Sequence, residues 1–130
     1  MSWIDQAITQ NKSFTTLNIK SGILRESGKT AEAEEIKKQA LTIATEPELN
    51  NYGYQLLGLS QNDKAIEVFK LATERFPKSP NAWDSLGEGY ALTGDSKNAI
   101  TSFKKAMTMS PPDNVRINSE KYLKQLGAMK

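Results

Sequence analysis

Apolar side chains recur every three or four residues along most of the chain, which is the spacing that places them on one face of an α-helix. In residues 80–113 the first such series is Trp83, Leu86, Gly87 and Tyr90, and the second is Ala99, Phe103, Ala106 and Met107. Gly94-Asp95 between the two series predicts a turn, with glycine in a left-handed conformation and aspartate capping the next helix. Pro111 ends the second helix. This segment therefore predicts two helices joined by a tight turn.

The same pattern occurs twice. When residues 46–79 are laid over residues 80–113, small residues fall on small ones, aromatic on aromatic and proline on proline, as in the pairs Gly53/Gly87, Ala65/Ala99, Phe69/Phe103, Ala72/Ala106 and Pro77/Pro111. Helix starts are marked as well. Ser79-Pro80 is typical of an N-cap followed by proline in the first turn, and Thr45 and Glu48 have capping-box spacing. An internal repeat of helix pairs is therefore expected.

These positions resemble a known family. Trp83, Leu86, Gly87, Tyr90, Ala99, Phe103, Ala106 and Pro111 resemble the eight-position signature of the tetratricopeptide repeat, and residues 46–79 carry a close variant at Leu49, Tyr52, Gly53, Leu56, Ala65, Phe69, Ala72 and Pro77. The resemblance implies an all-α fold in which helix pairs coil into a right-handed superhelical solenoid. First helices would line the concave side and second helices the convex side.

The rest of the chain fits one such domain over residues 1–130, with about three repeats. Residues 14–45 are expected to form a degenerate repeat, with Lys37 where the large aromatic residue belongs and Thr45 where the proline belongs. Residues 3–13 are expected to form a half repeat whose inward face is Trp3, Ile4, Ala7 and Ile8. Residues 114–127 are expected to form a capping helix started by Asp113, with Val115, Tyr122, Leu123 and Leu126 inward and Arg116, Lys121 and Lys124 facing water.

Composition excludes several classes of site. The 130 residues contain no cysteine and no histidine, so thiol chemistry, disulfides and zinc sites built on either residue are excluded, and the commonest general base is missing. A net charge of +2, with both signs interspersed, gives no field to attract nucleic acid. No apolar run is long enough to cross a membrane. We expect no metal and no cofactor.

The resemblance also implies where a partner would bind. By analogy with the family, the concave groove would be lined by Asn18, Arg25, Asn50, Tyr54, Asn81, Asp84 and Glu88. Side-chain amides can both donate and accept, which suits an extended peptide backbone. Asp84 and Glu88 lie four residues apart, so this end of the groove should favour basic or neutral ligands. The sequence departs from the groove type that clamps a C-terminal carboxylate, since Asn50, Asp84 and Ser85 occupy its slots for positive charge.

Each of these residues also has a purely structural interpretation. Trp83, Tyr52 and Tyr90 occupy core positions, Tyr54 could simply shield the helix behind it, and Asp84 and Glu88 could belong to a solvated helix face. Trp3 and Ile4 would present an apolar patch if the array begins within a repeat, and such patches tend to find partners. A homodimer formed through this end is therefore a hypothesis.

Two functions remain after catalysis is weighed. The one Ser-x-x-Lys match, Ser102 to Lys105, falls on a predicted convex helix, and no nucleophile–base arrangement is evident, so we expect no enzyme. The first function is a scaffold that binds a peptide or protein segment in the groove. The second is a structural spacer or oligomerisation module within a larger protein. A looser resemblance to the C-terminal repeats of some bacterial envelope proteins implies a periplasmic fragment; otherwise a cytoplasmic location stays open.

Overall fold

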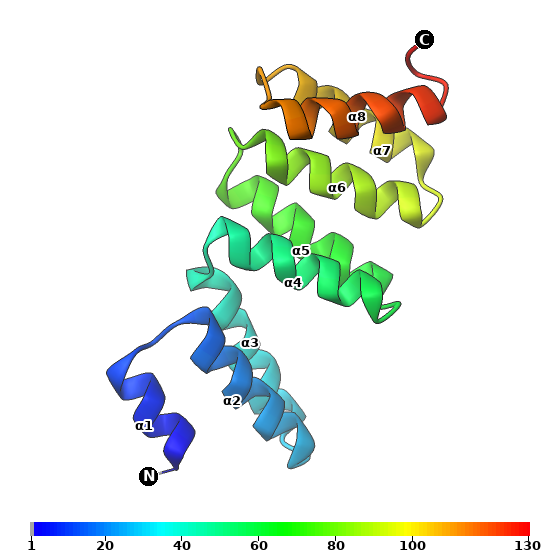
Figure 1. Cartoon of the computed structure of the whole chain (residues 1–130). Helices are drawn as coiled ribbons and strands as arrows, with labels where there is room; N and C mark the ends of the chain where they lie inside the picture. The colour runs from blue at the N-terminus through cyan, green and yellow to red at the C-terminus, as the bar shows by residue number, and fades with distance from the viewer. Residues whose placement is uncertain (1) are drawn as a thin grey trace. The chain divides into compact units, whose positions relative to one another are not determined.

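The expected all-α fold is confirmed. A computed structural model describes residues 2–130, and this part of the chain contains helices and turns without a strand. Its eight helices follow one another with short connections, and Figure 1 labels each of them: α1 (Trp3–Gln10), α2 (Phe14–Glu26), α3 (Thr30–Ile43), α4 (Glu46–Gly58), α5 (Asn62–Arg75), α6 (Pro80–Leu92), α7 (Ser96–Met107) and α8 (Asp113–Gln125).

The chain divides into two compact units. Unit 1 ends at Glu48 and contains α1, α2 and α3, and unit 2 comprises Leu49–Lys130 with most of α4 and all of α5 to α8. In unit 2, α4, α6 and α8 form one row, which we call the inner helices by analogy with the expected groove, and Figure 1 shows α5 and α7 behind this row. Contacts join α5 to α6, α6 to α7, and α8 to both α6 and α7.

Unit 1 is built on the α2–α3 pair. Leu17 of α2 and Ala33 of α3 are buried, and the Ser21 hydroxyl donates a 2.9 Å hydrogen bond to the Ala33 carbonyl. The short helix α1 packs on α2 and buries Ile4, which is only 4% exposed. The Nζ of Lys20 lies 2.7 Å from Oδ1 of Asp5 and ties the two helices together.

The expected inward face of α1 is wrong at its first position. Ile4, Ala7 and Ile8 turn toward the unit, but Trp3 is 64% exposed. Successive residues are rotated by about 100° on a helix, so the stripe that starts at Ile4 leaves Trp3 outside it. Ile4 is buried inside unit 1 and is not accessible to a partner. Of the two residues predicted for self-association, only Trp3 is therefore exposed.

The core of unit 2 depends on two glycines and two phenylalanines. Phe69 of α5 and Phe103 of α7 are fully buried. A Cβ atom at Gly53 would lie 2.3 Å from Cε1 of Phe69, and a Cβ atom at Gly87 would lie 2.7 Å from Cε1 of Phe103. Both distances are too short for a real carbon contact, so each glycine makes room for the aromatic ring of the second helix. Phe103 also stacks on Tyr122 of α8, with ring centroids 4.9 Å apart.

Four helices end in the same kind of turn. One residue has positive φ at each end, namely Gly28, Ser60, Gly94 and Gly127. In each case the next N–H bonds back to a carbonyl five residues earlier at 2.9 Å, from Lys29, Gln61, Asp95 and Ala128 to Leu24, Leu56, Tyr90 and Leu123. This is the Schellman arrangement, which satisfies carbonyls at the helix end. The left-handed conformation expected at Gly94 is confirmed.

Three of the four expected helix starts are confirmed. Thr45 and Glu48 form the reciprocal capping box, with N···O distances of 2.9 and 3.3 Å. The Ser79 hydroxyl accepts from the Ala82 N–H, and Asp95 accepts from the Asn98 N–H. Asp113 does not cap α8, because it is already the first helical residue and Pro112 is the N-cap.

Trp83 is less deeply placed than expected. It is half-buried rather than in the core, and its indole Nε1 donates a 2.9 Å hydrogen bond to the Pro77 carbonyl. Lys105 lies over its ring at 5.9 Å from the centroid. Trp83 therefore holds the turn between α5 and α6 against the helix pair that follows.

Candidate functional site

Seven polar residues connect the three inner helices of unit 2. They are Asn50 and Tyr54 on α4, Asp84, Ser85 and Glu88 on α6, and Asn118 and Ser119 on α8, and we call them the inner polar cluster. Four of them, Asn50, Tyr54, Asp84 and Glu88, are among the residues that the sequence predicts for a partner-binding groove. Hydrogen bonds between side chains join all seven into one connected network.

Asp84 lies at the junction of α6 and α8. Its Oδ1 accepts a 2.6 Å hydrogen bond from the Ser119 hydroxyl, and its Oδ2 accepts a 2.9 Å bond from Nδ2 of Asn118. Ser119 is fully buried and Asp84 is only 6% exposed. The junction is therefore made through a carboxylate and two neutral donors.

Glu88 lies one helical turn beyond Asp84 and is bonded on both sides. Its Oε1 accepts a 2.7 Å hydrogen bond from Nδ2 of Asn118, and its Oε2 accepts the hydroxyl of Tyr54. The Asn118 amide thus divides its two protons between two carboxylates. The Tyr54 ring meets Phe69 edge to face, with centroids 5.2 Å apart, so the helix α5 behind it fixes its position.

Asn50 and Ser85 extend the cluster across α4 and α6. The Ser85 hydroxyl donates to Oδ1 of Asn50, and the Tyr54 hydroxyl oxygen lies 3.4 Å from Ser85 Oγ. The Asn50–Ser85 bond spans 35 residues, and so does the Asp84–Ser119 bond. The α4–α6 contact and the α6–α8 contact are therefore made by side chains at equivalent repeat positions.

The cluster holds two acidic groups without a basic one. Within residues 2–130, no lysine or arginine forms an ion pair with Asp84 or Glu88. All four of their carboxylate oxygens accept hydrogen bonds from the neutral groups of Ser119, Asn118 and Tyr54. Hydrogen bonds stabilise the charges, but the like charges still repel each other.

This arrangement shifts two pKa values. Burial raises the pKa of the Asp84 carboxyl to about 6, and the nearby Glu88 charge adds to the rise, while the bonds from Ser119 and Asn118 oppose it. Burial also raises the pKa of the Tyr54 hydroxyl well above its ordinary value, and its bond to Glu88 acts in the same direction. Tyr54 therefore stays protonated and serves as a donor at neutral pH.

The solvated-face interpretation of Asp84 is wrong, because α8 covers the carboxylate. Because α8 was expected to be a solvating end helix, Asn118 and Ser119 were not among the predicted groove residues, and Ser85 was noted only as a position without the positive charge of a carboxylate-binding groove. A signal was present, since Asn118 and Ser119 stand at the same repeat positions as Asp84 and Ser85. Carrying the repeat alignment one step further into α8 would have found them.

The other predicted groove residues make separate contacts. In unit 1, Asn18 accepts a hydrogen bond from Nζ of Lys37, and Arg25 pairs with Glu34 at 2.9 Å on the exposed surface. Asn81 is half-buried near the start of α6. None of these three belongs to the inner polar cluster, so the structure brings together four of the seven predicted residues.

Two further classes of feature are absent from the described residues. Over residues 2–130, no three acidic side chains come close enough together to hold a metal ion. In the same range, no helix combines the length and the apolar character needed to cross a bilayer.

Comparisons with known proteins agree with this architecture. Residues 80–113 match the family model described as "Tetratricopeptide repeat". The chain is similar to the Sgt2 TPR domain from Aspergillus fumigatus, whose crystal structure matches with a TM-score of 0.59 and 24% identity over 88% of this chain and 79% of that one. That similarity concerns the fold.

Two longer relatives match part of the chain. One is Superkiller protein 3 from Schizosaccharomyces pombe, 42% identical over 50 residues, or 38% of this chain. The other is Superkiller complex protein 3 from Homo sapiens, 36% identical over 59 residues, or 45% of this chain. Each match covers only 4% of the relative's own length.

Proposed function

We propose that this chain, whose residues 80–113 match the tetratricopeptide repeat, is a scaffold of that kind, and that the inner helices of unit 2 bind a segment of another protein that carries a lysine or arginine beside Glu88. Repeats of this family form scaffolds for protein–protein interaction. The proposal adds the place and the chemistry of the ligand.

The observation that carries the proposal is the uncompensated charge of the inner polar cluster. Asp84 and Glu88 accept hydrogen bonds from neutral donors alone. Glu88 is half-buried, and each of its carboxylate oxygens has a second lone pair that can accept from an ammonium or guanidinium group. A cation placed there would relieve the repulsion between the two carboxylates and would form charge-assisted hydrogen bonds, which are stronger than neutral ones.

The position of the cluster suits an extended ligand. It runs across α4, α6 and α8, so a segment lying over these helices would meet Asn50 and Tyr54 at one end and Glu88 with Asn118 at the other. Asn50, Tyr54, Glu88 and Asn118 are half-buried, so part of each side chain still reaches solvent. Because hydrogen bonds hold the side chains in place, little conformational entropy would be lost when a ligand binds.

A second function is favoured by the same hydrogen bonds. In the part of the chain described, no buried side-chain nitrogen or oxygen lacks a partner, so the cluster already satisfies itself. A rigid spacer or assembly module would have this property, because the network would serve to fix the angle between neighbouring helices. One longer relative bears the name of a complex, Superkiller complex protein 3, which fits a role in assembly as well as in ligand binding.

The experiment compares two substitutions that each remove one negative charge from unit 2. In Glu88→Gln the side-chain oxygen still accepts from Asn118 and the new amide donates to Tyr54, whose hydroxyl turns to accept, so the network survives. The matched control is Glu67→Gln, which removes an exposed carboxylate from α5 in the same unit. Binding is measured by fluorescence anisotropy with degenerate peptide libraries that differ at one fixed position, occupied by Lys, Arg, Glu or Ala.

The proposal expects the Lys and Arg libraries to bind the parent chain and the Glu67→Gln chain alike. Glu88→Gln should weaken that binding by about tenfold, the effect of losing roughly 1.4 kcal/mol from one charge-assisted contact. Equal binding of all four libraries, or equal binding by the two variants, would contradict the basic-ligand proposal and favour the spacer.

A further inference from the structure

Six side chains form two rows across the inner helices of unit 2. Successive members of a row occupy the same position in successive repeats, 34 residues apart. The first row is Asn50, Asp84 and Asn118, and the second row, one helical turn later, is Tyr54, Glu88 and Tyr122. Five of the six belong to the inner polar cluster. The sixth, Tyr122 of α8, has the repeat position that Glu88 has on α6, and it follows Glu88 in the second row.

The hydroxyl of Tyr122 is influenced by both carboxylates but is not bonded to them. The ring of Tyr122 stacks on Phe103, with centroids 4.9 Å apart, and the side chain is half-buried. Burial raises the pKa of the hydroxyl, and the negative charges of Glu88 and Asp84 raise it further, so the group stays protonated at neutral pH. Within residues 2–130 the hydroxyl forms no hydrogen bond. Its oxygen is therefore an acceptor that a ligand can use.

Hydrogen-bond acceptors surround the half-buried Glu88. Each of its two carboxylate oxygens has a second lone pair. Asn118 donates its amide protons to Asp84 and Glu88, so the carbonyl oxygen of its side chain remains to accept. The hydroxyl oxygen of Tyr122 is the fourth acceptor. Nζ of Lys121 lies 5.6 Å from the centroid of the Tyr122 ring, but among the described residues it forms no ion pair with Glu88.

This set of acceptors matches a guanidinium group better than an ammonium group. Arginine presents five N–H donors in one plane and can bind both oxygens of a carboxylate at once, whereas lysine presents three donors from a single nitrogen. A guanidinium group also stacks on aromatic rings more readily than an ammonium group does. Because α6 and α8 are in contact, the acceptors of Glu88 and those of Asn118 and Tyr122 belong to adjoining helices.

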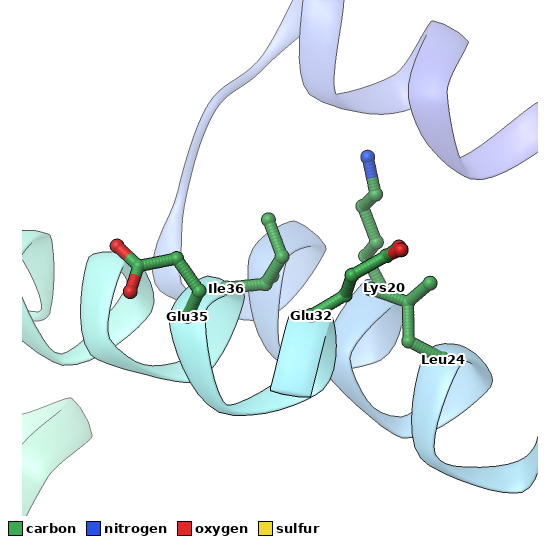
Figure 2. Close-up of a pocket in the computed structure, with 5 residues that line it drawn as sticks. All are labelled: Lys20, Leu24, Glu32, Glu35 and Ile36. Atoms are coloured by element: carbon green, nitrogen blue, oxygen red, sulfur yellow. The ribbon is translucent and has the colours of Figure 1, made fainter. Parts of the chain in front are cut away.

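A second group of carboxylates, in unit 1, lacks this pattern. A hollow there is lined by Lys20, Leu24, Glu32, Glu35 and Ile36, and Figure 2 shows Ile36 between the carboxylates of the two glutamates. A lysine of the chain is itself among the lining residues, and none of them is a tyrosine or an asparagine. The hollow therefore supplies a control carboxylate for the site on unit 2.

We propose that the segment bound by unit 2 places an arginine, rather than a lysine, beside Glu88, and that Tyr122 determines this preference. The inference rests on the proposed binding of a basic segment and names the side chain that the segment carries. One edge of the guanidinium group binds both oxygens of Glu88, and the other N–H groups donate to the carbonyl of Asn118 and the hydroxyl of Tyr122. A lysine at the same place leaves at least one of the four acceptors without a donor.

The test measures fluorescence anisotropy with degenerate peptide libraries whose one fixed position holds Arg, Lys, citrulline or Ala. Citrulline keeps the planar shape of arginine but not its charge. We expect the Arg library to bind the parent chain about tenfold more tightly than the Lys library, which is the effect of one charge-assisted hydrogen bond. The citrulline library should bind more weakly than the Arg library, because Glu88 then meets a neutral group.

Tyr122→Phe removes the hydroxyl and keeps the ring that stacks on Phe103. It should reduce the ratio of Arg to Lys binding to about threefold or less, as the loss of one hydrogen bond would. Urea unfolding verifies that the variant is folded. The matched control is Tyr90→Phe, because Tyr90 is another half-buried tyrosine of unit 2 with a lysine over its ring, Lys70 at 5.9 Å from the centroid. Tyr90→Phe and Glu35→Gln should both leave the ratio unchanged.

The possible failures can be told apart. If the Arg and Lys libraries bind equally and both bind better than the Ala library, the arginine preference is wrong and the basic-ligand proposal stands. If the Arg preference survives in Tyr122→Phe, the role assigned to Tyr122 is wrong. If the Arg, Lys and Ala libraries all bind equally, the proposed function is wrong, and the arginine preference is wrong with it.

Discussion

The hydroxyl of Ser119 donates a 2.6 Å hydrogen bond to Oδ1 of Asp84, although 35 residues separate them in the sequence. Ser85 and Asn50 are related in the same way one repeat earlier. A polar residue on one inner helix is thus bonded to a serine one repeat and one residue later. This relationship makes the last helix part of the structure that carries the candidate site.

Ser119→Ala tests the strength of that junction. The substitution removes a donor and leaves a buried carboxylate oxygen without it, which should lower the free energy of unfolding by about 2 kcal/mol. The control Thr101→Ala removes an exposed hydroxyl that bonds only to the Lys97 carbonyl, and should change stability by less than about 0.5 kcal/mol. Urea unfolding of the two variants gives the comparison. Equal effects would mean that the Ser119 bond contributes no more than a surface bond.

Asp84 predicts a specific dependence of stability on pH. Its pKa is about 6 in the folded chain, compared with an ordinary value of 3.8, so between these values the folded chain binds a proton that the unfolded chain has released. The free energy of unfolding should therefore fall as the pH rises from about 4 to about 6, and Asp84 should add no further change at higher pH. The full shift corresponds to about 3 kcal/mol, and partial access of solvent reduces it to about 1–2 kcal/mol.

Asp84→Asn isolates this effect, because asparagine cannot ionise while all other carboxylates stay in place. The difference in unfolding free energy between the parent and Asp84→Asn is measured by urea unfolding at several pH values. The parent should lose stability relative to the variant as the pH rises. Parallel pH profiles for the two chains would show that the Asp84 carboxyl titrates normally in the folded state.

Gly53 and Gly58 offer opposite outcomes on one helix. A methyl group at Gly53 would clash with Phe69, so Gly53→Ala should destabilise unit 2 by about 1–3 kcal/mol, as overpacking does. Nothing lies within 4 Å of a Cβ atom at Gly58, the last residue of α4, so Gly58→Ala should stabilise the chain by up to about 1 kcal/mol. Thermal melts of both variants decide the matter, and a destabilising Gly58→Ala would contradict the open surroundings of that residue.

Substitution of Ser60 by glycine should stabilise the chain. It adopts a φ of 60° where the three equivalent turns use Gly28, Gly94 and Gly127. A residue with a Cβ atom pays roughly 1 kcal/mol in the left-handed conformation, which glycine avoids. Ser60→Gly should therefore raise the free energy of unfolding by about 0.5 kcal/mol, after subtraction of the larger entropy of glycine in the unfolded chain. The reverse change, Gly94→Ser, should lower it, and equilibrium unfolding measures both.

Much of the fold could be predicted because repeated positions constrain one another. Gly87 and Phe103 were placed on the facing sides of two helices by their spacing, and Gly94-Asp95 indicated the turn between these helices, because both signals depend on local geometry. The exposure of Trp3 could not be predicted in the same way. A single apolar residue at the start of a helix can lie either within the buried apolar stripe or beside it. Which side it takes depends on how α1 packs on α2.

The candidate site was harder to predict than the fold. Asn50, Tyr54, Asp84 and Glu88 were selected by analogy of position, and the structure does bring these four together. The burial of Asp84 depends on α8, whose role as a polar partner rests on just two residues, Asn118 and Ser119. Polar residues on a terminal helix are common, so composition alone did not separate these two from residues that face water.

The amide of Asn118, which donates one proton to each of two carboxylates, also restricts how further repeats can be added to this protein. Tandem duplication of residues 80–113 is the simplest way to add a repeat, and it would place a copy of Asp84 at the position of Asn118. The copy of Ser85 would still bond to Asp84, but the bridging amide would be replaced by a third carboxylate facing Asp84 and Glu88. Repulsion among the three would oppose the new junction. The two repeats of unit 2 are therefore similar in form but not interchangeable, and an evolving array would have to change this position whenever it copied the repeat.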